Sequence, residues 1–339
     1  MENGIPEINF GELLDLRVDY AFKGIFAALD NKQLLISLLN AIFGHSGINR
    51  EIKDLTVTNP YLDKQSIDDK LSIIDIIAEL ADNTVISIEM HLYGLPEFKN
   101  KTLHTWARIF SDTVKEGETY TEFKPVICIS LIDGAIRDAN HKLIKGIHTL
   151  FQIMERDSHI LLTQTMELHY VNMEQFVRDQ AWKADENGKV DMFTKWLTLF
   201  TQNDIDDKTI IKKICQEEAV INMAVEALAR FSADDLDRFI YKRRIDELRN
   251  DATKTRRLIE AEKQIAETKR QVDEAKKQAD EAKQQADEAK QQVDEAKRKV
   301  DEEKQQADEA KRQANEEKQR ADEAKQQVDE TAGVSAHAS

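Results

Sequence analysis

The chain has 339 residues, of which 41% are hydrophobic and 33% are charged, and its formal net charge is −16. This length provides one large or two ordinary domains with a substantial core. The negative charge argues against a chain coated with basic groups for nucleic acid, so a nucleic-acid contact would need a local basic patch.

The first 140 residues carry a pattern that mixes helices and strands. Residues 73–91 read as two apolar strands joined by a turn at Asp82-Asn83, which suits positive φ. The other predicted elements are, in chain order, a helix over residues 31–44, a helix over residues 100–117 and a buried strand over residues 125–132. This order predicts an α/β fold in which helices flank a mixed central sheet, with the core domain spanning residues 10–140.

Residues 141–258 contain no proline, and their only glycines are Gly146 and Gly188. Apolar residues recur at helical spacing in segments such as MFTKWLTLF and INMAVEALARF. This region is therefore predicted to be a helical subdomain that packs on the sheet. Its end carries a basic run that either contacts DNA or forms the solvated face of a helix. The run consists of Lys242, Arg243, Arg244, Arg249, Lys254, Arg256 and Arg257.

Residues 259–330 repeat with a period of seven and are predicted to form a coiled-coil helix, followed by a disordered tail over residues 331–339. One seam of the repeat consists of Ile265, Val272, Ala279, Ala286, Val293, Val300, Ala307, Ala314, Ala321 and Val328. Sustained heptads favour a left-handed supercoil, and the Gln and Lys residues beside the seam favour a parallel pair of chains. Because alanine buries little area, a single charge-laced helix is the alternative.

The predicted hairpin carries two carboxylates and an imidazole among Ile, Val and Met residues. A turn near residue 82 sets Asp75 directly or diagonally across from Glu89, and the two-residue period of a strand sets His91 on the same face as Glu89. Facing carboxylates repel each other and are costly to bury. A divalent cation such as Mg²⁺, which prefers oxygen ligands, resolves the conflict. Alternatively, one carboxylate caps a strand end at the surface and His91 is a satisfied polar residue.

Several segments, in the same order, resemble the PD-(D/E)XK nuclease family transposases, also called Rpn recombination-promoting nucleases. They are VDYAFKGIFAALDNKQLLISLLNAIFG, DDKLSIIDIIAEL with TVISIEMH, and WARIFSDTVKEGETYTEFKPVICISLID. KWLTLF and FSADDLDRFIYKRRIDELRNDAT are similar to the helical C-terminal part of that family, so the resemblance covers residues 13–255. It implies a restriction-endonuclease-like core whose hairpin carries the catalytic motif.

In the motif that the resemblance implies, Asp75 is the first acid and Glu89 is the second. Together they would hold one or two Mg²⁺ ions, or Mn²⁺ in their place, which bind a phosphate oxygen and lower the pKa of a bound water. His91 stands where the wider superfamily has Lys and where this family often has Gln. A neutral imidazole can position or activate that water, since its reference pKa is about 6.5.

The resemblance also implies roles for residues outside the hairpin. The family's opening D-x-x-F-K is intact in DYAFK, with Asp19 and Lys23 at its ends. Asp19 would be a further metal ligand or would support a residue that binds the metal. Lys23 would neutralise the charge of a DNA phosphate. For each residue, the alternative is a surface salt bridge. Lys101 would contact the DNA backbone or be a solvated helix residue. The helix after the hairpin departs from the family, which tends to have Arg, Tyr and Gln where this chain has Lys101, Thr105 and Thr113.

Two classes of function follow. The first is a Mg²⁺-dependent DNA endonuclease that hydrolyses phosphodiester bonds in recombination or mobile-element biology. The second, favoured by His91 and the departures after it, is a catalytically silent relative that acts as a coiled-coil interaction protein. The predicted coiled coil implies a homo-oligomer in either case.

The sequence also indicates where the protein acts. It shows no apolar run of membrane-spanning length, and its first ten residues lack the basic and apolar regions of a signal peptide. Its two cysteines, Cys128 and Cys215, lie far apart and are expected to be core thiols in a reducing compartment. We therefore expect a cytoplasmic protein without a membrane partner.

Overall fold

The computed structural model describes residues 8–48, 50–58, 76–93, 98–114, 117–138, 142–183 and 189–335. The chain divides into two compact units, Met1–Arg257 and Leu258–Ser339. The first unit holds a six-stranded sheet and its helices, and the described part of the second belongs to one long helix, α8 (Asp235–Ser335). Among the described residues no single helix has the length and hydropathy to cross a membrane, although the pair Asp19–Phe26 and Leu29–His45, bent by 76°, has them jointly.

The central sheet has six strands in the order β1-β2-β3-β4-β6-β5. They are β1 (Leu55–Val57), β2 (Ile76–Leu80), β3 (Val85–Leu92), β4 (Val126–Asp133), β5 (His148–Phe151) and β6 (Met166–Asn172). β4 pairs in parallel with β3 on one side and with β6 on the other, and the other neighbours are antiparallel. The predicted mixed sheet is confirmed, and it is consistent with a restriction-endonuclease-like core.

β2 and β3 form the predicted antiparallel hairpin, in which Ile76 pairs with Ile88. The residues at its tip explain the turn. Asn83 has φ 65°, a left-handed conformation that asparagine tolerates, and the Thr84 N–H donates to Asp82 Oδ1 at 3.0 Å. This tight connection fixes the register of β3, the strand that carries the candidate site.

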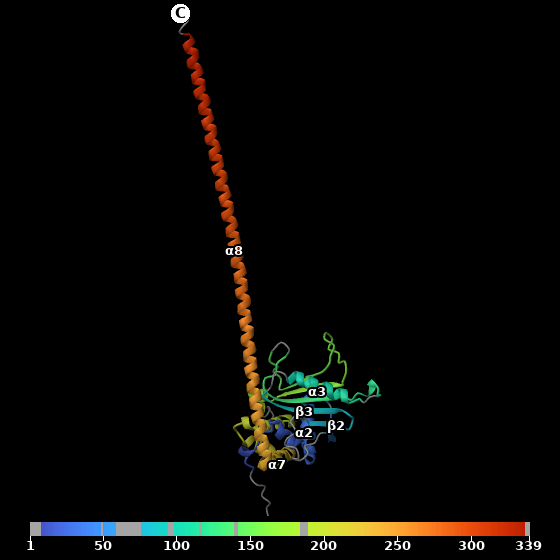
Figure 1. The fold of residues 1–339 in the computed structure, drawn as a ribbon. Coiled ribbons are helices and arrows are strands. Elements are labelled where there is room, and N and C mark those ends of the chain that lie inside the picture. The colour runs from blue at the N-terminus through green and yellow to red at the C-terminus, as the bar shows by residue number, and fades with distance from the viewer. Residues whose placement is uncertain are drawn as a thin grey trace, which may run out of the picture. The chain divides into compact units, whose positions relative to one another are not determined.

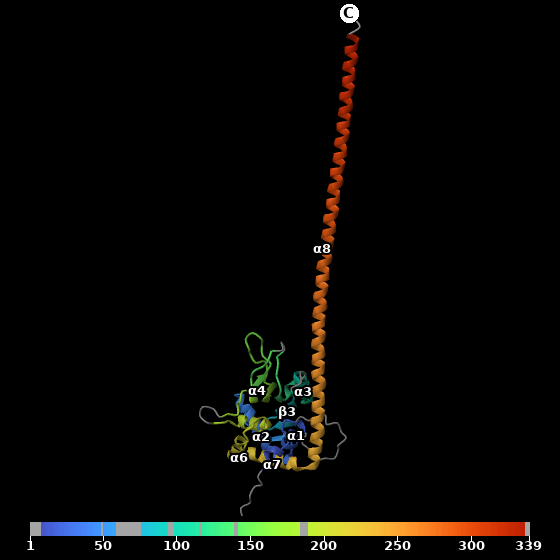
Figure 2. The same ribbon diagram turned by 90° about the vertical axis from the view of Figure 1, so that its left-hand side faces the viewer.

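Helices cover both faces of the sheet (Figures 1 and 2). α3 (Phe98–Asp112) packs on β4 from one face, and α1 (Asp19–Phe26) packs on β3 from the other. α2, α5 and α7 join α1 in the thicker layer. The remaining α-helices of this unit are α2 (Lys32–His45), α4 (Met173–Arg178), α5 (Met192–Phe200), α6 (Thr209–Glu217) and α7 (Ala219–Ala233). Single 3₁₀ turns cover Phe10–Glu12, Leu29–Asn31, Tyr120–Glu122 and Gln202–Asp204.

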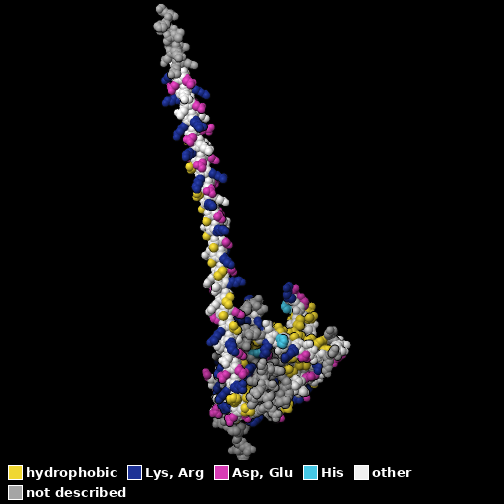
Figure 3. Space-filling model, in the orientation of Figure 1, with side chains coloured by type: hydrophobic (Ala, Val, Ile, Leu, Met, Phe, Trp, Pro, Cys, Tyr) yellow, Lys and Arg dark blue, Asp and Glu magenta, His cyan; other side chains and the backbone are white. Residues whose placement is uncertain are grey.

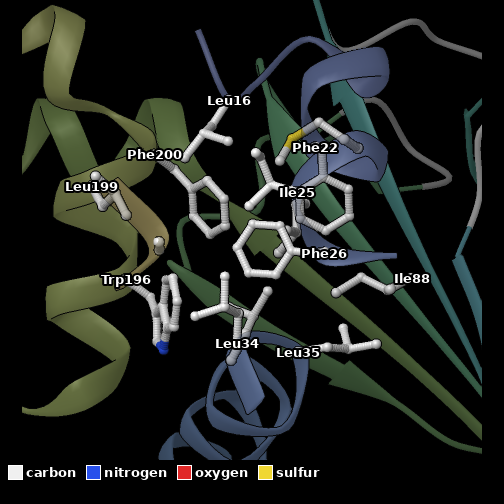
Figure 4. Close-up of a cluster of buried hydrophobic side chains, with 14 of the residues drawn as sticks. Leu16, Phe22, Ile25, Phe26, Leu34, Leu35, Ile88, Trp196, Leu199 and Phe200 are labelled. Carbon is white, nitrogen blue, oxygen red and sulfur yellow. The ribbon is translucent and has the colours of Figure 1, made fainter. Parts of the chain in front are cut away.

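The main core lies between the sheet and the thicker helical layer (Figure 4). Phe22 and Phe26, one turn apart on α1, stack with ring centroids 4.8 Å apart. Phe26 meets Trp196 of α5 edge-on at 5.5 Å and Phe200 at 5.8 Å. Trp196 is fully buried, and its Nε1–H donates to Ser37 Oγ of α2 at 3.2 Å. The apolar face of the predicted helix MFTKWLTLF therefore packs against both α1 and α2.

Two strands of the sheet lie in the region that the composition predicted to be helical. β5 and β6 fall within residues 148–172, so the sheet extends past residue 140 and the helical part begins after β6. β6 lies between β4 and β5. Its buried Glu167 and His169 interrupt the continuous apolar run that is typical of an interior strand. A lack of proline and glycine does not distinguish a helix from a strand.

The described part of the second unit is helical throughout. Residues 260–325 are all exposed, including the seam residues Ile265, Val272, Val293 and Val300. Figure 3 shows apolar side chains interspersed with acidic and basic ones along this helix. α8 continues to Ser335, so residues 331–335 are helical rather than part of the predicted disordered tail, because extending an existing helix requires no new nucleation. Residues 336–339 lie outside the described residues.

Candidate active site

Glu89 on β3 is the centre of a buried polar site beneath α3. Its side chain is almost inaccessible, with 6% of the residue exposed. The Lys101 ammonium of α3 forms an ion pair with Oε1 of Glu89, and Nε2 of His91 lies 3.2 Å from Oε2. The predicted placement of Glu89 and His91 on one face is confirmed. Burying an unpaired carboxylate is costly, so these two side chains make the buried charge tolerable.

The strands beside β3 give the site a polar floor. In the register of the three parallel strands, Glu89 lies beside Ser130, which lies beside Tyr170. The Ser130 hydroxyl is 3.2 Å from the Thr102 hydroxyl of α3. The ring of Phe98, at the start of α3, meets the ring of Tyr170 edge-on at 5.2 Å. The aromatic pair of Phe98 and Tyr170 therefore borders these polar residues at the N-terminal end of α3.

The inward side chains of α3 hold the helix on the sheet and leave Lys101 at its rim. Phe98 and Thr102 are buried, and Trp106 donates from Nε1 to the Val126 carbonyl at 3.1 Å. The Lys101 side chain is 57% exposed, although its ammonium reaches Glu89. The sequence alone left Lys101 as a DNA contact or a solvated residue. Its contact with Glu89 depends on how α3 docks, which no local pattern reports.

Asp75, the predicted first acid of the motif, lies outside the described residues. The described part of β2 begins at the next residue, Ile76, which pairs with Ile88, the residue before Glu89. Within the described ranges, no three His, Cys, Asp or Glu side chains form a group that could hold a metal ion. The described part of the predicted motif therefore consists of Glu89 and His91.

The structure places Asp19 and Lys23 on α1, on the face of the sheet opposite to α3. Asp19 is buried, and Arg244 of α8 donates from Nε to both of its carboxylate oxygens, at 2.9 and 3.0 Å, and from Nη2 at 2.6 Å. Burial is the largest single influence on the pKa of Arg244 and lowers it, but the hydrogen bonds and charges of Asp19 and Glu247 together outweigh burial and raise it. Asp19 thus anchors the first turns of α8 on α1. Lys23 is half-buried one turn further along α1.

Three of the seven residues in the basic run near the start of α8 pair with nearby carboxylates. Besides the bond between Arg244 and Asp19, Arg249 lies 3.7 Å from Asp246 and Lys254 lies 3.3 Å from Asp251. These pairs have the (i, i+3) spacing of neighbours on one helix face. These three residues therefore have the charge-balanced pairing of a solvated helix, and Lys242, Arg243, Arg256 and Arg257 are exposed.

Sequence reasoning missed a second buried polar cluster, on the opposite face of the sheet. His148 Nε2 lies 3.0 Å from His169 Nδ1, His169 Nε2 lies 3.4 Å from Glu167 Oε2, and Arg50 donates to the same Glu167 oxygen at 3.3 Å. If His169 donates to Glu167, its Nδ1 accepts from His148, which leaves the buried Nδ1 of His148 unprotonated. Burial, followed by the charges of His169 and His45, lowers the pKa of His148 to about 3.

A comparison with known proteins agrees with the fold. The family model of the PD-(D/E)XK nuclease family transposases matches residues 16–257, which include β3, α3 and the whole sheet. No curated protein and no solved structure matches the chain significantly. The match spans well over half of the chain and ends where the first compact unit ends. The chain belongs to the PD-(D/E)XK nuclease family transposases.

Proposed function

We propose that the chain is a metal-dependent DNA endonuclease that hydrolyses phosphodiester bonds, with Glu89 at its centre. Family membership supports a nuclease. The observation that carries the proposal is the buried Glu89 carboxylate, which has an imidazole on one oxygen and an ammonium that reaches solvent on the other. Buried carboxylates that are paired at an accessible rim are typical of catalytic sites. A role in recombination or mobile-element biology belongs to the same proposal.

The metal would be Mg²⁺, with Mn²⁺ as the alternative, and Asp75 and Glu89 would hold it. Glu89 supplies the oxygen ligand that these ions prefer, and its contact with Lys101 indicates that a cation fits at this buried carboxylate. Continuing the pairing of Ile76 with Ile88 by one residue predicts Asp75 opposite Glu89. When bound, the metal would polarise a phosphate oxygen and make a water molecule nucleophilic.

His91 and Lys101 would share the task that the motif lysine has in the wider superfamily. His91 Nε2, 3.2 Å from Glu89, lies where an imidazole can orient a water beside the carboxylate and accept its proton. Lys101 brings an ammonium to the same carboxylate from α3, so a cationic group is present although position 91 holds histidine. With DNA bound, we expect this ammonium to neutralise charge on the phosphate.

Asp19 and Lys23 would act at a distance from this centre. Because Arg244 binds both oxygens of Asp19, we assign Asp19 a positioning role, in which it holds α1 and the start of α8 together. Lys23, on the same helix, remains a proposed phosphate contact. Replacing Asp19 by Asn should therefore destabilise the fold more than it lowers the rate per folded molecule.

The proposed activity has a direct test with a matched control in the same hairpin. Purified protein is incubated with supercoiled plasmid DNA, with Mg²⁺ or with EDTA. We expect cleavage by the wild type only with Mg²⁺, loss of cleavage in Glu89→Gln and Asp75→Ala, and retention in Glu79→Gln. Glu79 is a hairpin carboxylate that pairs with Lys124 at 2.6 Å, away from Glu89. Cleavage by Glu89→Gln at the wild-type rate contradicts the proposal.

The second candidate function is a catalytically silent relative that acts as a coiled-coil interaction protein. The observation that favours it is the Lys101 ammonium, which occupies the carboxylate that a metal would need. This candidate predicts that neither Mg²⁺ nor Mn²⁺ supports cleavage by the wild type. It also predicts that Lys101→Met increases the affinity of Glu89 for Mn²⁺ without producing activity.

In either case we propose that residues 265–328 pair two copies of the chain in parallel. Exposed valines at heptad spacing support this partner. The full chain with Val272→Lys and Val293→Lys, at the seam, is compared with Gln284→Lys and Gln291→Lys, at positions that face away from it. We expect light scattering to show a dimer for the wild type and the control and a monomer for the seam variant. A monomeric wild type at about 100 µM rules out the pairing.

A further inference from the structure

The helix α3 meets the sheet through a hydroxyl contact that lies beside the contact of Lys101 with Glu89. Thr102 follows Lys101 on α3, and Ser130 is the register partner of Glu89 on the neighbouring strand β4. The hydroxyl oxygens of Ser130 and Thr102 lie 3.2 Å apart, and the Lys101 ammonium pairs with the Glu89 carboxylate. Two consecutive residues of the helix therefore contact two paired residues of the sheet.

The hydroxyl contact is buried, and the geometry around it identifies the donor. Thr102 is 2% exposed and Ser130 is 1% exposed. Thr102 donates from Oγ1 to the carbonyl oxygen of Phe98 at 2.9 Å. Because a hydroxyl has a single proton, Ser130 is the donor and Thr102 Oγ1 is the acceptor of the contact between them. Breaking this contact would leave the buried Ser130 donor without its partner, which is costly.

The hydroxyl contact fixes the position of α3 on the sheet in a way that its apolar side chains do not. Apolar packing is non-directional, whereas a hydrogen bond requires a defined distance and angle. A helix turns by about 100° and rises by about 1.5 Å per residue, so a slip of one residue would turn Lys101 away from Glu89. The Thr102 hydroxyl lies one residue from Lys101 and opposes such a slip directly.

We propose that Thr102 and Ser130 are positioning residues, which hold α3 where the Lys101 ammonium reaches Glu89. Both act through Lys101 and touch neither the metal nor the substrate. The catalytic meaning of the inference rests on the proposed nuclease function, but the position of the Lys101 ammonium can be measured without metal or DNA. The alternative is that Thr102 only contributes to the packing of α3, as any buried threonine does.

The chain offers a matched control for the loss of a buried helix threonine. Thr198 of α5 is fully buried in the thicker helical layer, and its Oγ1 donates to the carbonyl of Thr194, four residues earlier, at 2.7 Å. Thr102 makes the same kind of bond to Phe98, also four residues earlier. Thr102→Val and Thr198→Val therefore remove equivalent hydroxyls and equivalent backbone hydrogen bonds. Thr102→Val also removes the contact with Ser130.

Lysine labelling reports the position of the Lys101 ammonium directly. The full chain is treated with a limiting amount of acetic anhydride, without metal or DNA, and the acetylation of each lysine is followed by mass spectrometry. An ammonium that is held on a buried carboxylate must leave it before it can react, so Lys101 should react slowly in the wild type. Lys195 is the internal reference, because it pairs with Glu218 at 2.5 Å in the other helical layer and reports any general loosening of the fold.

We expect Thr102→Val to speed the acetylation of Lys101 by roughly threefold to tenfold, the factor of a weakened hydrogen bond to a charged group, and to leave Lys195 unchanged. Ser130→Ala should act in the same direction. In Thr102→Ser, which keeps the hydroxyl, and in Thr198→Val, Lys101 should react as in the wild type. The proposal is overturned by an unchanged Lys101 in Thr102→Val, by an equal acceleration in Thr198→Val, or by an equal acceleration of Lys195.

Plasmid cleavage measures the consequence for the proposed function. Thr102→Val should lower kcat by about 10- to 100-fold with little change in KM, because a small misplacement of a catalytic group is costly. Adding Thr102→Val to Lys101→Met should lower kcat no further, since both changes act through one ammonium. Cleavage by the wild type with unchanged acetylation of Lys101 in Thr102→Val refutes this inference alone. Faster acetylation in Thr102→Val without cleavage by the wild type refutes the nuclease function alone.

Discussion

Each face of the sheet carries a buried carboxylate with a cation beside it, but the two clusters differ in their access to solvent. On the α3 face, Glu89 pairs with Lys101, whose side chain is 57% exposed. On the opposite face, Glu167 pairs with Arg50, and the neighbouring His169 is fully buried. The chemistry of the two clusters is similar. What differs is the thickness of the helical layer above each one.

This difference explains why only one cluster is assigned to catalysis. Among the described helices, α3 alone packs on the first face, so a side chain at its rim links solvent to the buried carboxylate. Four helices and the aromatic core around Trp196 cover the second face. A buried polar network beneath such a layer contributes to a unique packing and is less open to a substrate, although the Arg50 side chain is 23% exposed. Accessibility, rather than the presence of carboxylates and histidines, therefore marks the candidate site.

The largest expected effect is on the rate of DNA cleavage, and it compares His91 on the α3 face with His148 on the opposite face. If His91 orients the attacking water, His91→Ala should lower the cleavage rate by about 10²–10⁴-fold, the span of a lost general base. His148→Gln, on the opposite face, should leave the rate within about twofold. His91→Gln restores the residue that is common in the family and should retain most of the activity. Single-turnover plasmid cleavage measures all three, and unchanged rates in His91→Ala would remove His91 from the mechanism.

A second contrast concerns stability, between one tryptophan from each face. Trp196→Ala removes a fully buried ring from the main core and should lower the free energy of unfolding by about 3–5 kcal/mol. Trp106→Ala, which removes a half-buried ring from α3, should cost less. Denaturant unfolding followed by circular dichroism gives both values. If Trp106→Ala costs as much as Trp196→Ala, the α3 face is not the thinner of the two layers.

The smallest expected effect is a pH dependence of stability that arises from the buried cluster of His148, His169 and Glu167. The pKa of His148 is about 3 in the folded chain, against about 6.5 when exposed, so protons bind more readily to the unfolded state. This contribution to stability is complete above about pH 6.5 and is lost as the pH falls towards 3. The titratable and charged groups that face His148 are His45, Arg50, Glu167, His169 and Asp191.

Asp191 acts in the same direction as His148. A hydrogen bond from His45 is the largest cause of its lowered pKa, so its contribution is also present at neutral pH and lost in acid. Because the ordinary pKa of Asp191 is 3.8, its contribution is lost only below about pH 4. The fall in the free energy of unfolding between pH 7 and pH 5 should therefore come from His148, and it should be smaller in His148→Gln. Equal falls in the wild type and the variant would mean that other groups carry the pH dependence.

Local sequence patterns are sufficient to predict the hairpin but not the edge of the sheet. The turn at Asp82-Asn83 and the two-residue period of a strand correctly predict that Glu89 and His91 share one face. The prediction of helix is wrong for β5 and β6, because the buried Glu167 network gives an interior strand a polar sequence. The spacing of apolar residues, two for a strand and 3.6 for a helix, identifies the secondary structure of a segment only when its buried face is apolar.

The site contacts that sequence reasoning missed join residues from separate elements. Lys101 reaches Glu89 from a different element, and Arg244 reaches Asp19 across 225 positions of the chain. Neither pair follows a helical or strand spacing, so no periodicity predicts it. Charged residues at exposed helix positions are usually solvated, and only the docking of α3 and α8 shows which ones meet a buried carboxylate.

The most direct test of the proposed site is whether a divalent metal binds at Glu89 and not at the matching carboxylate of the other face. Mn²⁺ is titrated calorimetrically into the wild type, Glu89→Ala and Glu167→Gln, each checked for folding by circular dichroism. We expect binding by the wild type and Glu167→Gln and none by Glu89→Ala. Binding by Glu89→Ala with the affinity of the wild type would contradict the assignment of the metal to Glu89.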